Sequence, residues 1–130
     1  ERADGSLLMS IRFWENRTYS RWDAATGEWS EITAWPEITE PACNGDMIRI
    51  ADRKKDILIH SIPLDSKLRK NVSLMKSTDN GTTWTLMEQV WDCNSAYSSM
   101  SVMKNGDLGL ISEVELTGIY YIFFTRHKIQ

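Results

Sequence analysis

Short runs of apolar or alternating residues, bounded by turn residues, recur along the whole chain. Eight such runs stand out: Gly5 to Phe13, Met47 to Ala51, Asp56 to Ile62, Asn71 to Lys76, Thr83 to Val90, Ser98 to Met103, Leu108 to Val114 and Gly118 to Thr125. Runs of this length and period are typical of β-strands. No segment combines a sustained helical period with helix caps. The pattern therefore predicts an all-β chain.

The turns between the runs narrow the choice of architecture. Lys104-Asn105-Gly106-Asp107 separates two of the runs, and Asn-Gly is a strong hairpin signal because both residues tolerate positive φ. Strands that recur every eight to twelve residues or so suit a sandwich, a barrel or the blades of a propeller.

A degenerate internal repeat favours propeller blades among these three. Ser77-Thr-Asp-Asn-Gly-Thr-Thr-Trp84 fits the pattern Ser-x-Asp-x-Gly-x-Thr-Trp, and Ser20 to Trp29 is a damaged copy that retains Asp23, Gly27 and Trp29. In the intact copy the aspartate can bind turn amides, the glycine can take the left-handed conformation and the tryptophan can pack beneath the turn. We expect the motif to be structural in both places.

Size and charge exclude several classes of function. The chain has 130 residues and a formal net charge of −3, which allows one domain but not a complete large repeat fold. Its basic residues are scattered, so we expect no nucleic-acid partner. No apolar run approaches the ~20 residues of a membrane span, and residues 1–10 carry no visible targeting signal.

The cysteines and histidines show no metal-ligand spacing. Cys43 and Cys93 form either one disulfide or two free thiols, and the pair fixes no cellular compartment. His60 and His127 are isolated, and we expect structural roles for both. The sequence predicts no metal site and no cofactor.

The intact repeat is an Asp box, which occurs in sialidases and in other propellers such as the sortilin-like receptors. Glu1 to Arg12 resembles the sialidase strand that ends in the second arginine of the family's arginine triad. Pro41 to Arg49 resembles the family's Cys-Gln/Asn-Gly/Ala-Ser loop, with Asp46 in place of the usual serine. That departure makes the contacts of Asn44 and Asp46 an open question.

Two further stretches resemble sialidases in the right order. His60 to Pro63, followed by Arg69 and the Asp box, is similar to the stretch that carries the third triad arginine. Ser95-Ala-Tyr-Ser-Ser99 resembles the motif of the nucleophilic tyrosine, and Leu108 to Glu113 resembles the strand that follows it. The resemblance covers nearly the whole chain.

The resemblance implies a fold and a reaction. The fold would be a partial six-bladed β-propeller of about two blades and part of a third, with residues 1–130 as the C-terminal part of a sialidase catalytic propeller domain. The reaction would be removal of terminal sialic acid with retention, with Tyr97 as nucleophile and Arg12, Arg69, Glu113 and Asn44 as substrate-binding residues. The partners implied are sialylated glycoproteins, glycolipids and oligosaccharides, and a secreted, cell-surface or lysosomal location would suit them better than the cytoplasm.

The chemistry fits these residue types. Arginine forks match a carboxylate bidentately, and sialic acid carries a carboxylate on its anomeric carbon. A neutral phenol approaches this anionic centre more readily than a carboxylate does, and sialidases are the tyrosine exception among glycosidases. A phenol has an ordinary pKa near ~10, so it needs a carboxylate base, and the leaving group needs a general acid. By the resemblance, the base glutamate precedes residue 1 and the acid and first arginine lie in earlier blades, so the chain alone should be inactive.

Other interpretations stay open. Arginines and tyrosines on strands are commonly ordinary surface or packing residues. We expect Arg2, Arg17, Arg21, Arg49 and Arg53 to be solvated, although Arg17 and Arg21 are close enough to Arg12 to leave the choice of triad arginine open. A non-catalytic Asp-box propeller that binds a glycan or protein, and a sialidase-like lectin, are the alternative functions. Linkage preference, and transfer to a sugar instead of water, are not encoded in these motifs.

Overall fold

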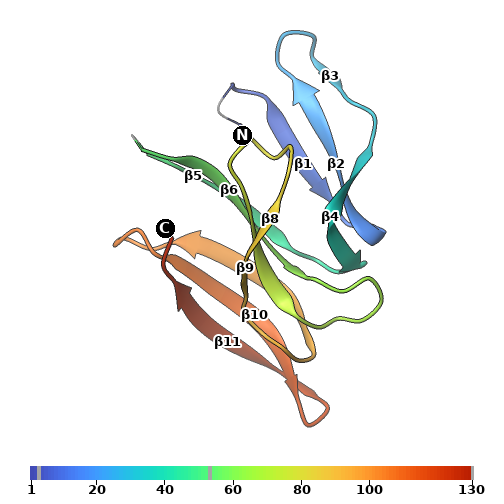
Figure 1. Ribbon diagram of the computed structural model, residues 1–130, viewed down its shortest axis with the longest axis vertical. Coiled ribbons are helices and arrows are strands. Elements are labelled where there is room, and N and C mark those ends of the chain that lie inside the picture. Colours follow the sequence, from blue (N-terminus) through green and yellow to red (C-terminus); the bar gives the residue numbers. More distant parts are fainter. Residues whose placement is uncertain (3, 53, 130) are drawn as a thin grey trace.

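The computed structural model describes residues 1–2, 4–52 and 54–129, which form eleven β-strands and no helix (Figure 1). All strand pairs within the sheets are antiparallel. The predicted all-β class is confirmed. The described residues contain no helix long and apolar enough to cross a membrane.

The strands form three separate sheets that follow one another along the chain. The first contains β1 (Leu7–Ile11), β2 (Trp14–Asp23), β3 (Glu28–Trp29) and β4 (Thr33–Pro41), with β1 on one side of β2 and both β3 and β4 on the other.

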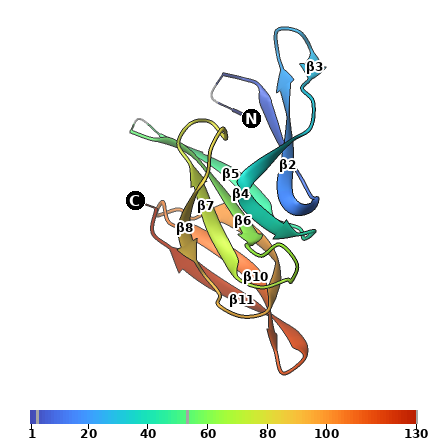
Figure 2. The same ribbon diagram turned by 45° about the vertical axis from the view of Figure 1, so that its right-hand side comes forward.

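The other two sheets are simple meanders. The second runs β5 (Asp46–Ala51), β6 (Asp56–Pro63), β7 (Val72–Ser77) and β8 (Thr85–Gln89), and the third runs β9 (Ser95–Val102), β10 (Leu108–Leu116) and β11 (Ile119–His127). The second sheet lies between the other two in both ribbon views (Figures 1 and 2). The result is an open row of three blade-like sheets.

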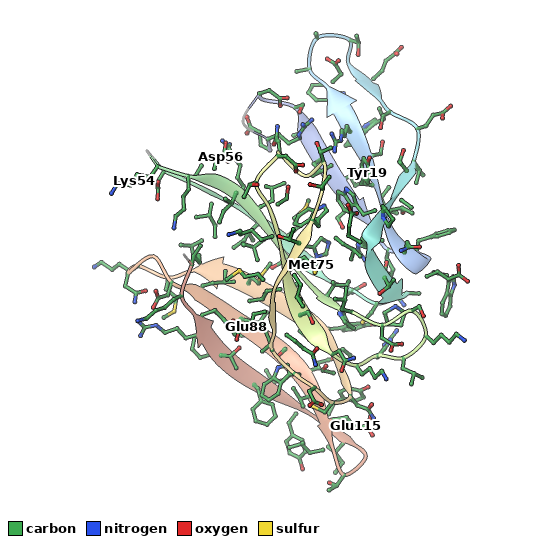
Figure 3. All side chains as sticks on the ribbon, viewed as in Figure 1. Tyr19, Lys54, Asp56, Met75, Glu88 and Glu115 are labelled. Atoms are coloured by element: carbon green, nitrogen blue, oxygen red, sulfur yellow. The ribbon has the colours of Figure 1, made fainter. Side chains whose placement is uncertain are left out.

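Strand β6 is buried on both faces because it lies in the middle sheet. Ile57 and Ile59 pack toward the third sheet, in a cluster with Leu74 and Leu110. Leu58 and Ile62 belong instead to a second cluster, which also contains Trp35, Ile38, Met75 and Trp84. Successive residues of a strand point to opposite faces, so a strand covered on both sides is a continuous apolar run. Figure 3 shows Met75 near the centre of the molecule.

The predicted hairpin is present between β9 and β10. Met103 N donates to Asp107 O at 2.7 Å and Gly106 N donates to Met103 O at 2.8 Å. Gly106 has φ +87°, whereas Asn105 is not among the residues with positive φ. One left-handed residue is enough to close this turn.

The intact Asp box has the predicted structure. Asp79 accepts hydrogen bonds from the side chains of Ser77 and Thr83 and from the backbone amides of Thr82 and Thr83. Gly81 has φ +79°, and Trp84 is 3% exposed. The turn therefore rests on a buried indole.

The damaged copy differs at its tryptophan. Asp23 accepts from the backbone amides of Ala25 and Thr26, and Gly27 has φ +73°, so the aspartate and the left-handed glycine keep their roles although they stand four positions apart instead of two. Trp29, however, is 46% exposed and pairs across the strands with Trp22. The tryptophan of the damaged copy therefore does not pack beneath its turn as Trp84 does.

Candidate functional site

Arg12 and Asn44 form the first pair of candidate residues. Arg12 directly follows β1, Asn44 lies in the loop between β4 and β5, and Arg12 Nη1 donates to Asn44 Oδ1 at 3.2 Å. Both side chains are exposed. The next residue, Gly45, lets this loop lie flat on β6, because a Cβ there would meet Ile62 Cδ1 at 2.7 Å.

Arg69 and Tyr97 form the second pair. Arg69 lies in the loop between β6 and β7, and its Cζ is 5.2 Å from the centroid of the Tyr97 ring, within the range of a cation–π contact. The loop is fixed to the start of β9, because Ser95 N donates to Arg69 O and Asn71 N donates to Cys93 O, each at 3.0 Å.

A β-bulge places Tyr97 beside Glu113. Ser112 pairs with Ser98 and Val114 pairs with Ser95, so Ala96 and Tyr97 together oppose Glu113. Bulges of this kind redirect side chains: Ala96 is buried, whereas Tyr97 is 37% exposed. Tyr97 N lies 3.4 Å from Glu113 Oε2, to which it donates.

The two pairs share a neighbour, the buried thiol of Cys43. Burial raises the pKa of Cys43, while the positive charges of Arg69 and Arg12 act in the opposite direction. Two arginines from different sheets therefore act on the same atom. Arg69 likewise opposes the raised pKa of Tyr120, which burial and then the charge of Glu115 produce. Figure 3 shows Glu115 near the hairpin that joins β10 to β11.

Asp46, which replaces the usual serine, has a structural role in this chain. Its Oδ2 accepts from Met100 N at 2.7 Å and from Ser99 Oγ at 3.2 Å, and its Oδ1 accepts from Met47 N at 2.8 Å. The carboxylate thus joins β5 to β9, the strand that carries Tyr97. Sequence reasoning registered the substitution but gave no sign of this contact.

The expectation that Arg17 is solvated is wrong. Arg17 is 5% exposed and its Nη1 lies 3.2 Å from Glu40 Oε1 in an ion pair whose carboxylate is fully buried. Burial lowers the pKa of Arg17, and the neighbouring Glu40 opposes that change. A buried, paired guanidinium cannot receive a substrate, which leaves Arg12 as the better candidate.

The other arginines are mixed in their exposure. Arg21 is half-buried, donates to Gly81 O at 2.9 Å and lies over the Tyr19 ring at 4.9 Å. Arg2 is also half-buried and donates to Asn80 O. Arg49 is exposed and paired with Asp56, and Arg53 lies outside the described residues. Among those that the structure describes, only Arg49 fits the solvated role expected for the group.

Both histidines have structural contacts. His60 is fully buried between Trp35 and Trp84, and burial, followed by the charge of Arg17, lowers its pKa to about 3. His127 is buried, and its Nδ1 lies 2.8 Å from Glu88 Oε2. Among the described residues, no three metal-ligating side chains gather. Cys43 and Cys93 are both free thiols.

Known proteins resemble this chain in sequence and in structure. A sialidase from Bacteroides fragilis is 29% identical over 125 residues, which covers 87% of this chain and 23% of the relative. The Hadza microbial sialidase Hz136 superposes with a TM-score of 0.80 at 22% identity, covering 96% of this chain and 25% of that structure. The NanB sialidase from Streptococcus pneumoniae superposes with a TM-score of 0.81 at 17% identity, covering 99% of this chain and 22% of that structure. No family model matches the sequence.

These likenesses confirm two predictions. The resemblance to sialidases, first drawn from short motifs, holds over most of the chain, and the three open sheets have the arrangement of a partial sialidase propeller. The chain spans about a quarter of the length of the relatives that it matches. The roles of Arg12, Asn44, Arg69, Tyr97 and Glu113 stay predictions.

Proposed function

We propose that this sialidase-like chain is part of a glycoside hydrolase that removes terminal sialic acid from glycoproteins, glycolipids and oligosaccharides. The observation that carries the proposal is the pairing of Arg69 with Tyr97 at 5.2 Å, beside the Arg12 and Asn44 pair. A phenol and two exposed guanidinium groups are the residue types that an anionic sugar centre requires.

In this proposal, Arg12 and Arg69 bind the carboxylate of sialic acid. Both are exposed and neither has an ion-pair partner among the described residues, so neither guanidinium charge is already neutralised by a carboxylate. Asn44 orients Arg12 through the 3.2 Å contact. Because this contact restricts the side chain of Arg12 before the substrate arrives, less side-chain entropy is lost on binding.

Tyr97 is the nucleophile in this proposal. Its Oη attacks the anomeric carbon as the bond to the aglycone oxygen breaks, the phenolic proton passes to a base, and a general acid protonates the leaving oxygen. Water then attacks the same carbon, gives a proton to the deprotonated general acid and displaces the phenolate of Tyr97, which regains its proton from the base, so two inversions give net retention. Glu113 lies at the same bulge, where it would brace the first arginine of the triad.

We also propose that residues 1–130 are the C-terminal part of a longer catalytic propeller, called the parent protein below. The hollow beside Tyr97 and Glu113 has a volume of about 200 Å³, below the ~300 Å³ at which ligand pockets usually begin, and neither Arg12 nor Arg69 lines it. A site completed by other blades would supply the rest, including the base, the acid and the first arginine. A secreted, cell-surface or lysosomal location suits such substrates.

The test is hydrolysis of a fluorogenic sialoside by the parent protein, its Tyr97→Phe variant and residues 1–130 alone. Tyr121→Phe is the matched control, since Tyr121 is a similarly exposed tyrosine on β11. We expect activity in the parent and the control, and at least a ~100-fold loss in Tyr97→Phe. We expect none from residues 1–130.

The same assay separates the alternatives. A parent protein that binds sialosides without turnover is a lectin. One that neither binds nor cleaves them is an Asp-box propeller with another ligand, and the roles given to Arg12, Arg69 and Tyr97 would then be wrong.

A further inference from the structure

Glu40 is a fully buried carboxylate that binds two separate backbone segments. Its Oε1 accepts from Phe13 N at 2.8 Å and its Oε2 accepts from Cys43 N at 2.9 Å. Phe13 is the residue after Arg12, and Cys43 is the residue before Asn44. One side chain thus fixes the backbone next to both members of the Arg12 and Asn44 pair.

Arg17 completes this arrangement from the opposite side. Its Nη1 donates to Glu40 Oε1 at 3.2 Å and to Cys43 O at 3.0 Å. The carbonyl of Cys43 belongs to the peptide unit that leads into Asn44. The cation therefore neutralises the buried carboxylate and also holds the peptide group adjoining a candidate substrate-binding residue.

The ion pair is anchored in a chain of satisfied hydrogen bonds. Arg17 Nε donates to Ser10 Oγ at 2.7 Å, and Ser10 Oγ lies 2.7 Å from His60 Nε2. His60 Nδ1 lies 3.1 Å from Ser61 O, which can only accept, so Nδ1 carries the proton and Nε2 accepts from Ser10. The buried charges are held by fixed partners from β1, β2, β4 and β6, which leaves little freedom to shift.

We propose that Glu40 and Arg17 are positioning residues that set the place of Arg12 and Asn44 for binding of the substrate carboxylate. The inference rests on the proposed function. Neither residue touches substrate, because both are buried. They act through the two peptide groups described above, where a displacement of an ångström is enough to weaken a bidentate contact.

The test compares Glu40→Gln with two control variants in the parent protein. A glutamine keeps the shape but presents an NH₂ group to donors, so Arg17, Phe13 N or Cys43 N loses its acceptor. Glu37→Gln makes the same change at an exposed position of β4, and Ile38→Val weakens the core on the same strand without touching the pair. Folding of each variant is checked by circular dichroism before the assays.

Two readouts separate positioning from general destabilisation. The first is KM and kcat for the fluorogenic sialoside. The second is the ratio of inhibition constants for free sialic acid and its methyl ester, which lacks the carboxylate charge. We expect Glu40→Gln to raise KM about tenfold with a smaller change in kcat, as for lost binding of ground state and transition state alike. We also expect Glu40→Gln to prefer the free acid over the methyl ester by a smaller factor than the parent protein does. Both control variants should match the parent protein in KM and in this preference.

Each result is decisive. Unchanged KM and acid preference in Glu40→Gln, or equal changes in Ile38→Val, would overturn the positioning role while leaving the proposed function intact. Arg17→Lys keeps the charge but replaces the guanidinium fork with a single nitrogen. It should change KM and the acid preference in the same direction as Glu40→Gln but by less. It takes the place of Glu40→Gln if that variant does not fold. A parent protein that neither binds nor cleaves sialosides overturns the proposed function itself, and the positioning role with it.

Discussion

The two copies of the Asp box share an aspartate, a left-handed glycine and a tryptophan, but they differ in the spacing of these residues and in which of them is buried. Both hold an aspartate against turn amides and a glycine in the left-handed conformation. In the intact copy Trp84 follows Gly81 by three positions and is 3% exposed, whereas in the damaged copy Trp29 follows Gly27 by two positions and is 46% exposed. Alternate positions of an extended chain face opposite ways. From aspartate to glycine the damaged copy spans four positions against two, and from glycine to tryptophan two against three, so its turn differs and its tryptophan is exposed.

The tryptophan of the first sheet that packs against the intact turn is Trp35 of β4, not Trp29. Its indole Nε1 donates to Gly81 O at 3.0 Å, its ring stacks on Tyr19 with centroids 4.5 Å apart, and Trp84 meets it edge-on at 5.2 Å. The intact turn is thus tied to two sheets, and the damaged turn lies at the edge of one. The hydrogen bonds of each turn come from residues close by in the sequence. The contribution of the turn to stability depends instead on the side chains that pack beneath it.

The largest expected effect is the loss of the buried plug. Trp84→Ala should destabilise the parent protein by about 3–5 kcal/mol, because the cavity would lie between Trp35, His60 and Met75. Trp29→Ala, at the exposed equivalent position, should change stability by less than about 1 kcal/mol. Urea unfolding of both variants measures the difference, and similar midpoints would show that burial is not what separates the two copies.

The next effect is a pH dependence of the cluster under the intact turn. The pKa of His60 is about 3 in the folded protein, lowered by burial and then by Arg17, against about 6.5 when unfolded. Below pH 6.5 the unfolded chain binds a proton that the folded chain does not, so stability present above pH 6.5 is lost as the pH falls toward 3. Between pH 6.5 and about 4.5 the loss should be about 2 kcal/mol.

The control for this prediction removes the titrating group. His60→Gln should be less stable than the parent at pH 7 but should lose the His60 part of the decline between pH 6.5 and 4.5. Urea midpoints at several pH values test this. An equally steep decline in the variant would assign the dependence to other groups.

The glycines of the two turns should also respond differently. Gly81→Ala should cost about 2–3 kcal/mol, because its positive φ strains any side chain and a Cβ would contact the side chains of Leu8 and Leu58. Gly27→Ala should cost about 1 kcal/mol, since its φ is similar but nothing lies within 4 Å of the new atom. Thermal melting of the matched pair isolates the packing contribution. Equal losses would mean that backbone strain alone accounts for both.

The sequence predicted the strands that are rich in apolar residues and missed two strands whose inward positions include charged residues. The predicted run Asp56 to Ile62 matches β6 almost to the residue, because a strand covered on both faces is a nearly continuous apolar run, here interrupted by the buried His60 and Ser61. Strands β2 and β4 were not predicted. Their inward positions include Arg17, Ser20 and Glu40, which look like surface residues until the partner 23 positions away in sequence is known.

The candidate site divides in the same way. Arg12, Asn44, Arg69, Tyr97 and Glu113 were named from resemblance, and the structure arranges them as two contacting groups. Glu40, Arg17 and Asp46 were not anticipated in the roles they have, since their contacts join strands that are distant along the chain. Short motifs identify residues whose type is required. The residues that hold them in place are recognised only from their tertiary contacts.

The smallest effect in the comparison concerns the aspartates themselves. Burial raises the pKa of Asp79, but hydrogen bonds from Thr83, Ser77 and Thr82 outweigh it and lower the pKa to about 2. Asp79→Ala should destabilise the parent protein by about 1–2 kcal/mol, as for other side chains that cap backbone amides. Asp23→Ala should cost less, about 0.5 kcal/mol, because the side chain of Asp23 accepts from only Ala25 and Thr26 among the described residues.

Since the folded pKa is depressed, the contribution of Asp79 is present above pH 3.8 and is lost as the pH falls toward 2. Urea midpoints at pH 7 rank the two variants, and a larger loss in Asp23→Ala would mean that the damaged turn, despite its exposed tryptophan, is the more important of the two.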